Sequence, residues 1–231
     1  MLKIGGLQKM TLLDYPGKIA ATIFLAGCNF RCPFCHNPDL VQIKEKGHYL
    51  ETKDVLDFLK KRKDLLEAVC ISGGEPLLDQ DLPNFLKKVK ELGYLIKLDT
   101  NGSNSAGLNK IIKSKLVDYI AMDIKGSLDK YQEITKTKFD LDNIKESIKI
   151  IRESGLPYEF RTTVLPKYHN VLEIEKISQL IPQADIYFLQ NFRNKITLDP
   201  EFNKEGTFTE QELLNLKSIA DQWVKKCEIR F

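Results

Sequence analysis

Three cysteines lie within eight consecutive positions of the chain, in the segment GCNFRCPFCHNPD at residues 27–39. They are Cys28, Cys32 and Cys35, and His36 follows the third directly. Thiols at this spacing suit three kinds of chemistry, namely a zinc site, an iron–sulfur cluster or disulfide bonds. The loop also contains glycine, asparagine and proline, which bend easily, so all three thiolates could turn toward one metal centre.

Disulfide bonds are the least favoured of these three interpretations. The first residues, MLKIGGLQKMTLLDYPGK, lack the apolar core of a signal peptide, and no later apolar run approaches the ~20 residues that cross a bilayer. The sequence therefore predicts a cytoplasmic protein without a membrane segment, in a compartment where disulfides are rare. Five cysteines are also an odd count, which favours metal binding or catalysis.

Zinc and iron remain as alternatives for the cysteine segment. Zinc would take His36 as its fourth ligand, but Cys35 and His36 are adjacent and would have to converge from neighbouring backbone positions. A 4Fe-4S cluster on three cysteines would keep one iron open for a substrate or cofactor. Cys70 and Cys227 fit ordinary buried thiols better than a fourth ligand.

Composition indicates an ordinary globular protein. The chain has 231 residues, of which 42% are hydrophobic and 29% are charged. A net charge of only +3 does not favour a nucleic-acid partner. We expect one domain over residues 1–231, with an N-terminal strand or extension at 1–17, a cluster loop at 28–40, and a C-terminal helix and short strand at 208–231.

Strand-like apolar runs alternate with amphipathic helical patterns, which predicts an α/β fold with parallel strands. Such a rhythm fits either an incomplete barrel or a doubly wound sheet. The expected strands are 18–27, 68–74, 94–102, 117–125, 158–166 and 185–192, with a short last one at 227–231. The expected helices are 52–64, 81–93, 106–115, 141–155, 170–183 and 209–225.

Polar residues follow the carboxyl ends of the first four expected strands. In either architecture these ends face a ligand, so the chemistry should collect on one rim. The residues are Cys28, then Gly73, Gly74 and Glu75, then Asp99, Thr100 and Asn101, and finally Asp123 and Lys125.

The cysteine segment resembles the radical S-adenosylmethionine (SAM) superfamily, whose motif is Cys-x3-Cys-x-aromatic-Cys, with Phe34 as the aromatic residue. The stretch SGGEP resembles the Gly-Gly-Glu-Pro segment of this superfamily, and LDTNG and MDIK resemble strand ends of glycyl-radical-enzyme activases. The N-terminal stretch at residues 14–41 resembles in particular the activating proteins of anaerobic ribonucleotide reductase. The resemblance implies an incomplete (β/α)6 barrel with helices outside. It also implies a 4Fe-4S cluster on Cys28, Cys32 and Cys35, with SAM on the open iron.

The resemblance further implies which residues bind SAM. Backbone at Gly73 and Gly74 would meet the methionine amino group, while the Glu75 side chain would either contact SAM directly or orient the loop. Lys125 would pair with the SAM carboxylate. Phe34, which lies between two ligands and cannot easily join the main core, would lie near the adenine.

The remaining candidate residues have open roles. Asp99 and Asp123, with Thr100 assisting, would bind an ammonium group or a monovalent cation. Arg161 matches an arginine of the activases, although a partly buried ion-pair partner is an equally good interpretation. His36 either contacts the cluster or orders the loop, and His48 and His169 are expected to be surface or packing residues.

The implied reaction is reductive cleavage of SAM to methionine and a 5′-deoxyadenosyl radical. An activase would use that radical to form a glycyl radical on a partner such as anaerobic ribonucleotide reductase, with flavodoxin or ferredoxin as the one-electron donor. A radical SAM enzyme acting on a small molecule or RNA is the alternative, and a non-catalytic zinc or electron-transfer protein is a more distant one.

One stretch departs from the pattern. Activases of the pyruvate formate-lyase type carry a histidine after a late strand, whereas this chain reads FLQNFRN at 188–194. Gln190, Asn191 and Arg193 are the residues that could take its place.

Overall fold

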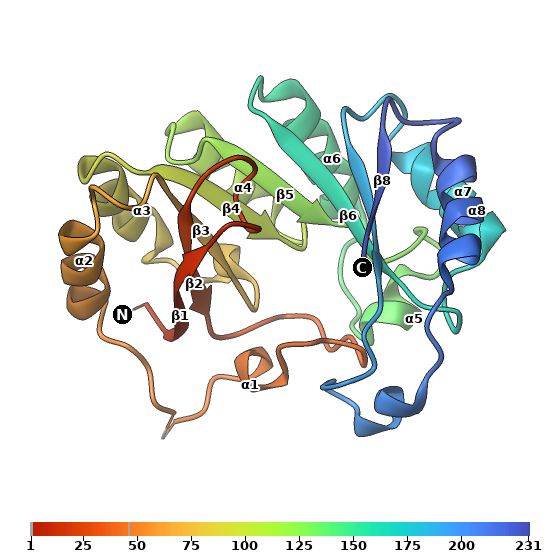
Figure 1. Cartoon of the computed structure of the whole chain (residues 1–231), viewed down its shortest axis with the longest axis horizontal. Coiled ribbons are helices and arrows are strands. Elements are labelled where there is room, and N and C mark those ends of the chain that lie inside the picture. Colours follow the sequence, from red (N-terminus) through yellow and green to blue (C-terminus); the bar gives the residue numbers. More distant parts are fainter. Residues whose placement is uncertain (1, 46) are drawn as a thin grey trace. The chain divides into compact units, whose positions relative to one another are not determined.

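The computed structural model describes residues 2–45 and 47–231 of the chain, with the elements labelled in Figure 1. Two compact units are distinguished by their internal packing. Unit 1 holds the residues up to Asn29, Asp39–Thr100 and Asn104–Ile120, and unit 2 holds Phe30–Pro38, Asn101–Ser103 and Ala121–Phe231. The expected single domain over 1–231 stays a prediction.

The strands of unit 1 begin with an antiparallel pair, β1 (Ile4–Thr11) and β2 (Ala20–Leu25). Parallel pairing follows from β2 to β3 (Ala68–Gly73) and from β3 to β4 (Leu95–Thr100). Thr22, Cys70 and Lys97 stand at one level across these three strands. Because side chains alternate along a strand, residues at one level share a face, and a row of polar side chains therefore crosses this part of the sheet.

The main helices of unit 1 are α2 (Thr52–Lys61), α3 (Leu82–Glu91) and α4 (Ser105–Lys113). Each buries one apolar stripe, such as Leu82, Phe85, Leu86 and Val89 of α3, which explains the helical period in the sequence. The Asn104 side chain accepts a hydrogen bond from the Gly107 backbone and caps α4. The short helices α1 (Pro38–Val41) and η1 (Pro76–Leu78) have too few residues for a period and were not predicted.

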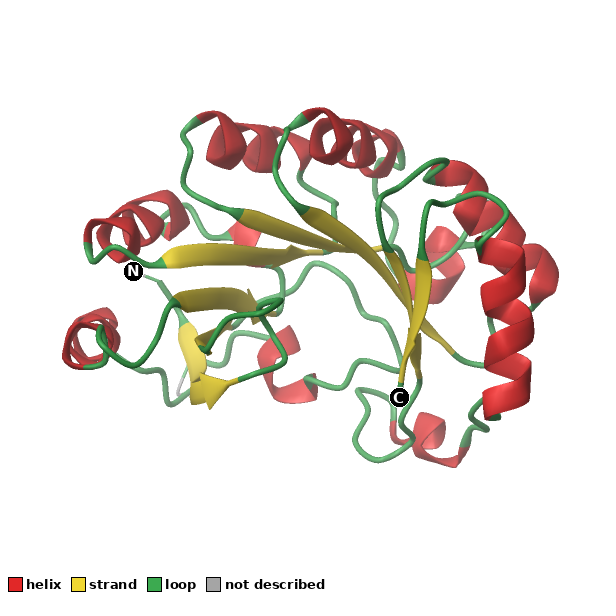
Figure 2. Cartoon of the chain, turned by 45° about the horizontal axis from the view of Figure 1, so that its top comes forward, coloured by secondary structure: helices red, strands yellow, loops and turns green. Residues whose placement is uncertain are grey.

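The strands of unit 2 continue the pattern. Unit 2 contains the end of β5 (Tyr119–Asp123) and three further strands, β6 (Tyr158–Val164), β7 (Tyr187–Asn191) and β8 (Cys227–Arg230). The pairs β6–β7 and β7–β8 are parallel. The helices are α5 (Tyr131–Thr135), α6 (Asp142–Glu153), α7 (Val171–Leu180), η2 (Pro200–Lys204) and α8 (Glu210–Ala220). Figure 2 shows helices and strands alternating along this part of the chain.

Strand order decides between the two architectures that the sequence left open. The eight strands follow one another in the sheet as they do in the chain, from β1 to β8. A doubly wound sheet would instead reverse its order at a switch point. The predicted α/β fold with mainly parallel strands is confirmed, and the sequential order is the one that a partial barrel uses.

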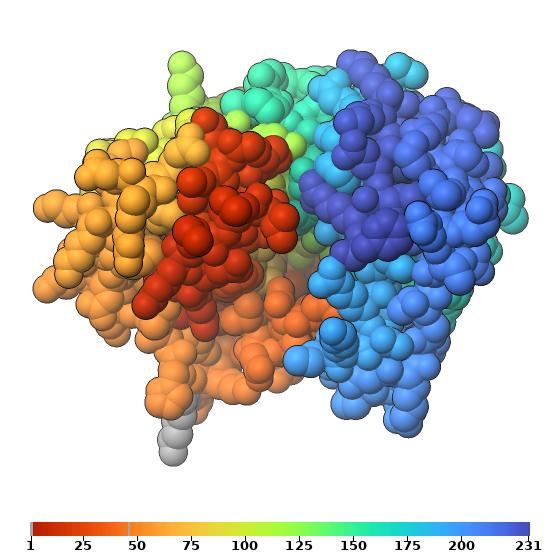
Figure 3. Space-filling view, viewed as in Figure 1, coloured from red at the N-terminus to blue at the C-terminus, as the bar shows by residue number. Residues whose placement is uncertain are grey.

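The first strand lies at the edge of the sheet. The turn that follows it exposes apolar side chains, with Leu12 68% and Leu13 88% exposed, and Figure 3 shows this N-terminal stretch in red on the surface. Lys9 and Gln8 are exposed on the strand itself. Polar and charged side chains of this kind discourage pairing with another chain. Among the described residues, no helix combines the length and hydropathy needed to span a membrane.

A glycine pair holds β2 and β3 close together at their carboxyl ends. A Cβ on Gly74 would lie 2.0 Å from the Gly27 carbonyl oxygen, and Gly73 has a φ of +117°. Both features require glycine. The backbone after β3 can therefore lie directly against the start of the cysteine loop.

Gly74→Ala should destabilise the protein by roughly 1–3 kcal/mol, because the new methyl group overlaps a backbone oxygen that cannot rotate away. Urea unfolding measures this free energy. Gly206→Ala is the control, since a Cβ there meets open space and should change stability by less than about 0.5 kcal/mol. Equal effects of the two substitutions would contradict the packing argument.

Candidate active site

The three cysteines divide between the two units. Cys28 belongs to unit 1, where its backbone N–H donates to the Val41 carbonyl over 2.9 Å. Cys32 and Cys35 belong to unit 2, where the Cys35 N–H donates to the Cys32 carbonyl over 3.0 Å in a tight turn. All five cysteines are free thiols, so the structure has no disulfide. Within either unit, the described residues form no group of three metal-binding side chains, so the set of three thiolates stays a prediction.

The SGGEP segment packs on the backbone that leads into Cys28. The Gly74 N–H donates to the Leu25 carbonyl over 2.8 Å, and the Glu75 N–H donates to the Gly27 carbonyl over 2.8 Å. The close approach permitted by the glycine pair is therefore an approach to the chain's own backbone. It ties the predicted SAM-binding loop to the first predicted cluster ligand.

Glu75 points into the protein. Its side chain is 2% exposed and accepts hydrogen bonds from the Leu77 N–H over 3.1 Å and the Thr100 hydroxyl over 2.8 Å. The first bond caps η1 and the second joins the ends of β3 and β4. In this geometry Glu75 orients the loop, and Thr100, a predicted cofactor residue, is buried beneath it.

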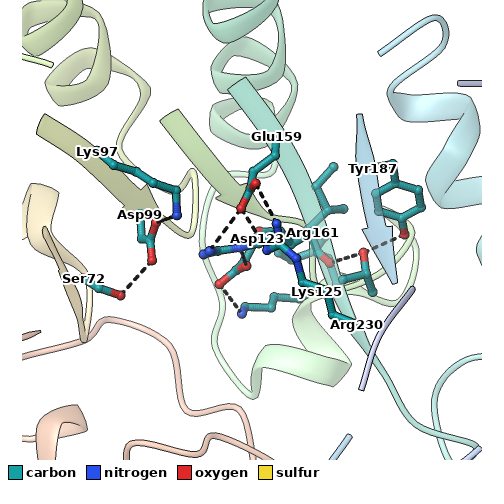
Figure 4. A network of polar contacts seen from close by, with 12 residues as sticks. Ser72, Lys97, Asp99, Asp123, Lys125, Glu159, Arg161, Tyr187 and Arg230 are labelled. Carbon is teal, nitrogen blue, oxygen red and sulfur yellow. Dashed lines mark hydrogen bonds and ion pairs between the residues drawn. The ribbon is translucent and has the colours of Figure 1, made fainter. Parts of the chain in front are cut away.

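Asp99 is held between two side chains of its own unit. The Ser72 hydroxyl donates to Oδ2 over 3.0 Å, and the Lys97 ammonium lies 2.8 Å from Oδ1, as Figure 4 shows. The Lys97 side chain is 3% exposed. Lys97 was not predicted, although its position two residues before Asp99 on a strand places both side chains on one face.

Asp123 and Lys125 form the corresponding pair in unit 2. The Asp123 carboxylate accepts from Arg161 Nε over 2.8 Å and lies 3.2 Å from the Lys125 ammonium. Burial raises the pKa of Asp123, but Arg161 and Lys125 lower it more, so that its pKa falls below the usual range. Burial lowers the pKa of Lys125, and the Asp123 carboxylate and Cys32 thiol raise it above the usual range. Both groups are charged at neutral pH.

A chain of charges extends from this pair across unit 2. Glu159 is 1% exposed and lies between Arg161, at 3.6 Å, and Arg230, which donates to both carboxylate oxygens over 3.1 and 3.0 Å. Figure 4 shows Glu159 and Asp123 on either side of the Arg161 guanidinium. Arg161 is thus the buried ion-pair partner that the sequence allowed, and it positions Asp123. Glu159 and Arg230 were not predicted.

His169 lies beneath Lys125. The imidazole is 1% exposed, its Nδ1 accepts from the Leu165 N–H over 3.3 Å, and its Nε2 donates to the Lys125 carbonyl over 3.1 Å. These two bonds require the neutral imidazole. Burial lowers the pKa of His169 to about 4. The expected packing histidine is therefore one that fixes the backbone of a predicted SAM residue.

Phe34 corrects one expectation. It is 4% exposed and packs with Tyr168 and Phe192, at ring-centroid distances of 6.0 and 6.5 Å. The expectation that it could not join the core is wrong, because the Cys32–Cys35 turn directs the ring inward. His36 stacks on the other side of the same cluster, at 5.4 Å from Phe192, and its Nε2 lies 2.8 Å from the Arg193 carbonyl. His36 orders the loop, whereas a contact of Phe34 with adenine stays a prediction.

The stretch FLQNFRN at residues 188–194 makes contacts with other parts of unit 2. The Asn191 amide donates to the Phe208 carbonyl over 2.8 Å, and the Arg193 guanidinium donates to the Phe231 carbonyl. Gln190 pairs in register with Arg230 on β8. A replacement for the activase histidine among these three residues stays a prediction.

Comparison with known proteins identifies the family of the chain. The family model described as the radical SAM superfamily matches residues 22–181, which include all three clustered cysteines. The chain belongs to the radical SAM superfamily. As an enzyme of this superfamily, it uses a 4Fe-4S cluster and SAM, and the zinc alternative is thereby rejected. The donor set fits these groups, since the free thiols suit iron and the charged Lys125 suits a carboxylate.

Relatives within this superfamily are similar over most of the chain. A protein of Methanocaldococcus jannaschii, whose name marks it as a candidate glycyl-radical enzyme activating enzyme, is 37% identical over 98% of this chain and 95% of its own. The pyruvate formate-lyase-activating enzyme of Clostridium pasteurianum is 32% identical over 78% of this chain and 76% of its own. Streptococcus suis SuiB bound to SAM shares the fold, with a TM-score of 0.68, 18% identity and coverage of 88% of this chain and 48% of SuiB.

The buried His169 makes this radical SAM enzyme sensitive to acid. Its pKa is about 4 when folded, against 6.5 as the ordinary value, so the unfolded chain takes up the proton first as the pH falls. Between pH 7 and 5 the wild type should therefore lose about 2 kcal/mol of stability through this residue. Urea unfolding at both pH values should show a smaller loss for His169→Gln. An equal loss in both proteins would contradict the assignment.

Proposed function

We propose that this radical SAM enzyme is a glycyl-radical-enzyme activase, which removes a hydrogen atom from a glycine of a partner protein. The observation that carries the proposal is similarity over nearly the whole length to a candidate activating enzyme, at 37% identity and 95% coverage of that relative. A second relative named as a pyruvate formate-lyase-activating enzyme supports the same reaction class.

In this proposal Cys28, Cys32 and Cys35 hold the cluster, and SAM completes it. When bound, these groups would supply hydrogen-atom abstraction, in which one electron and one SAM would be consumed to give methionine, 5′-deoxyadenosine and a glycyl radical. Lys125 binds the SAM carboxylate as a point charge. Asp123, fixed by Arg161, holds Lys125 in its charged form.

The proposal also gives the loop residues of unit 1 a part in positioning SAM. Backbone at Gly73 and Gly74 meets the amino group of SAM, in the segment that Glu75 and Thr100 hold rigid through their 2.8 Å hydrogen bond. Asp99, held by Ser72, adds a carboxylate whose direction is fixed. Phe34 lies at the adenine. A rigid set of polar groups reduces the entropy lost when SAM is ordered for reaction.

We expect the partner to be an anaerobic ribonucleotide reductase or a relative, and the electron donor to be a flavodoxin or ferredoxin. A cytoplasmic location fits five free thiols, which persist in a reducing compartment. The competing function is a radical SAM enzyme acting on a small molecule or RNA, which would use the same cofactor residues.

Electron paramagnetic resonance separates these functions. The cluster-loaded enzyme, reduced and mixed anaerobically with SAM and a candidate glycyl-radical protein, should generate a glycine-centred doublet. The same partner with its radical glycine replaced by alanine is the control and should give no signal. Cleavage of SAM without a glycine-centred signal on any candidate partner would favour the small-molecule or RNA function.

The cluster ligands are tested by Cys32→Ala, which removes one of the three proposed thiolates. Iron and sulfide per chain after anaerobic reconstitution should fall to background. Cys227→Ala is the matched control, because this thiol is buried in β8 and has no role in the proposal. Iron retained by Cys32→Ala, or zinc in place of iron in the wild type, would contradict the ligand assignment.

A further inference from the structure

A buried lysine lies beside a carboxylate that was expected to bind a cation. Lys97 is 2% exposed, and its ammonium lies 2.8 Å from Asp99 Oδ1. Fully buried lysines are rare, because burying an ammonium costs free energy that only a fixed partner offsets. The pairing therefore indicates that Lys97 and Asp99 act together.

The surroundings hold Lys97 in this position. The lysine shares a level of the sheet with Thr22 and Cys70, and its ammonium lies 5.9 Å from the centre of the Tyr119 ring. One level below, Ala68 and Leu95 pair in register and form an apolar layer with Tyr15, Ala20 and Tyr119. This layer and the Tyr119 ring form part of the surroundings of the lysine, whose ammonium contacts Asp99 Oδ1 at 2.8 Å.

The other carboxylate of the expected cation site has its own counter-charges. Asp123 pairs with Arg161 at 2.8 Å and with Lys125 at 3.2 Å. Each of the two aspartates is thus neutralised by a side chain of its own unit. An added monovalent cation would bring further positive charge to groups that are already compensated, so the residues present do not fit the expected cation.

We propose that the Lys97 ammonium takes the place of a bound monovalent cation as the counter-ion of Asp99. Lys97 is thereby a positioning residue: with Ser72 on the other oxygen, it fixes the direction in which the Asp99 carboxylate faces SAM. This inference rests on the proposed role of Asp99 at SAM. It does not depend on which substrate the enzyme attacks.

The test measures SAM affinity in the presence and absence of small cations. Wild-type, cluster-loaded enzyme should bind SAM equally well in tetramethylammonium chloride and in potassium or sodium chloride. Lys97→Ala vacates the ammonium position, so its SAM dissociation constant should rise by about tenfold or more in tetramethylammonium buffer. Potassium or sodium should restore most of that loss by entering the vacated position.

Thermal unfolding of the cluster-free protein gives a second measurement that involves no SAM. Potassium should raise the melting temperature of Lys97→Ala but not that of the wild type, relative to tetramethylammonium. Lys90→Met is the matched control, because it removes a more exposed ion pair of the same unit, with Asp118. That variant should show no response to the choice of cation.

Several outcomes would overturn the inference. They are a wild-type enzyme that needs potassium or sodium to bind SAM, and a Lys97→Ala variant that binds SAM normally in tetramethylammonium buffer. If Lys97→Ala does not fold, the uncharged pair Lys97→Met with Asp99→Asn replaces it and should bind SAM weakly with no cation response; normal binding by this pair would refute the proposal. If the SAM-binding and melting results are as expected but no glycyl radical forms on a partner, the activase function is contradicted and the role of Lys97 is not.

Discussion

The site in unit 2 depends on ion pairs between largely buried carboxylates and cations. Asp123 on β5, Arg161 and Glu159 on β6, and Arg230 on β8 alternate in sign. Each of the two carboxylates contacts two cations, so the members of this chain compensate one another. The chain of charges therefore holds the three strands to one arrangement, and it leaves Lys125 ionised beside Asp123. The group proposed to bind the SAM carboxylate is thus charged before the ligand arrives.

In unit 1, close packing of the backbone fixes the predicted SAM-binding segment. At Gly73 and Gly74 the absence of a Cβ brings the end of β3 against the residues that precede Cys28. Glu75 then closes the segment with bonds to η1 and Thr100. Movement of the Glu75 side chain would break these two hydrogen bonds, and a side chain at Gly74 would overlap the Gly27 backbone. Both units thus present their predicted cofactor residues on rigid supports, as hydrogen-atom transfer demands of a catalyst that must control position.

The sequence predicted what periodicity and local chemistry determine. Apolar runs and amphipathic stretches located six strands and the long helices, including α8, whose start is capped by Thr209 as part of a capping box. Contacts between residues far apart in the sequence were not predicted. Arg230 contacts Glu159, which lies 71 positions earlier, and no pattern near either residue indicates the pair. Lys97 could have been found from its spacing to Asp99. Phe34 was misjudged because the direction of its ring is set by the Cys32–Cys35 turn.

Reductive cleavage of SAM by the isolated protein tests the account most directly, because it requires the cluster and the SAM site but no partner. The reconstituted enzyme, reduced anaerobically and supplied with SAM, should release methionine and 5′-deoxyadenosine in equal amounts, as measured by liquid chromatography. A protein that holds a reduced 4Fe-4S cluster and yet leaves SAM intact would contradict the account.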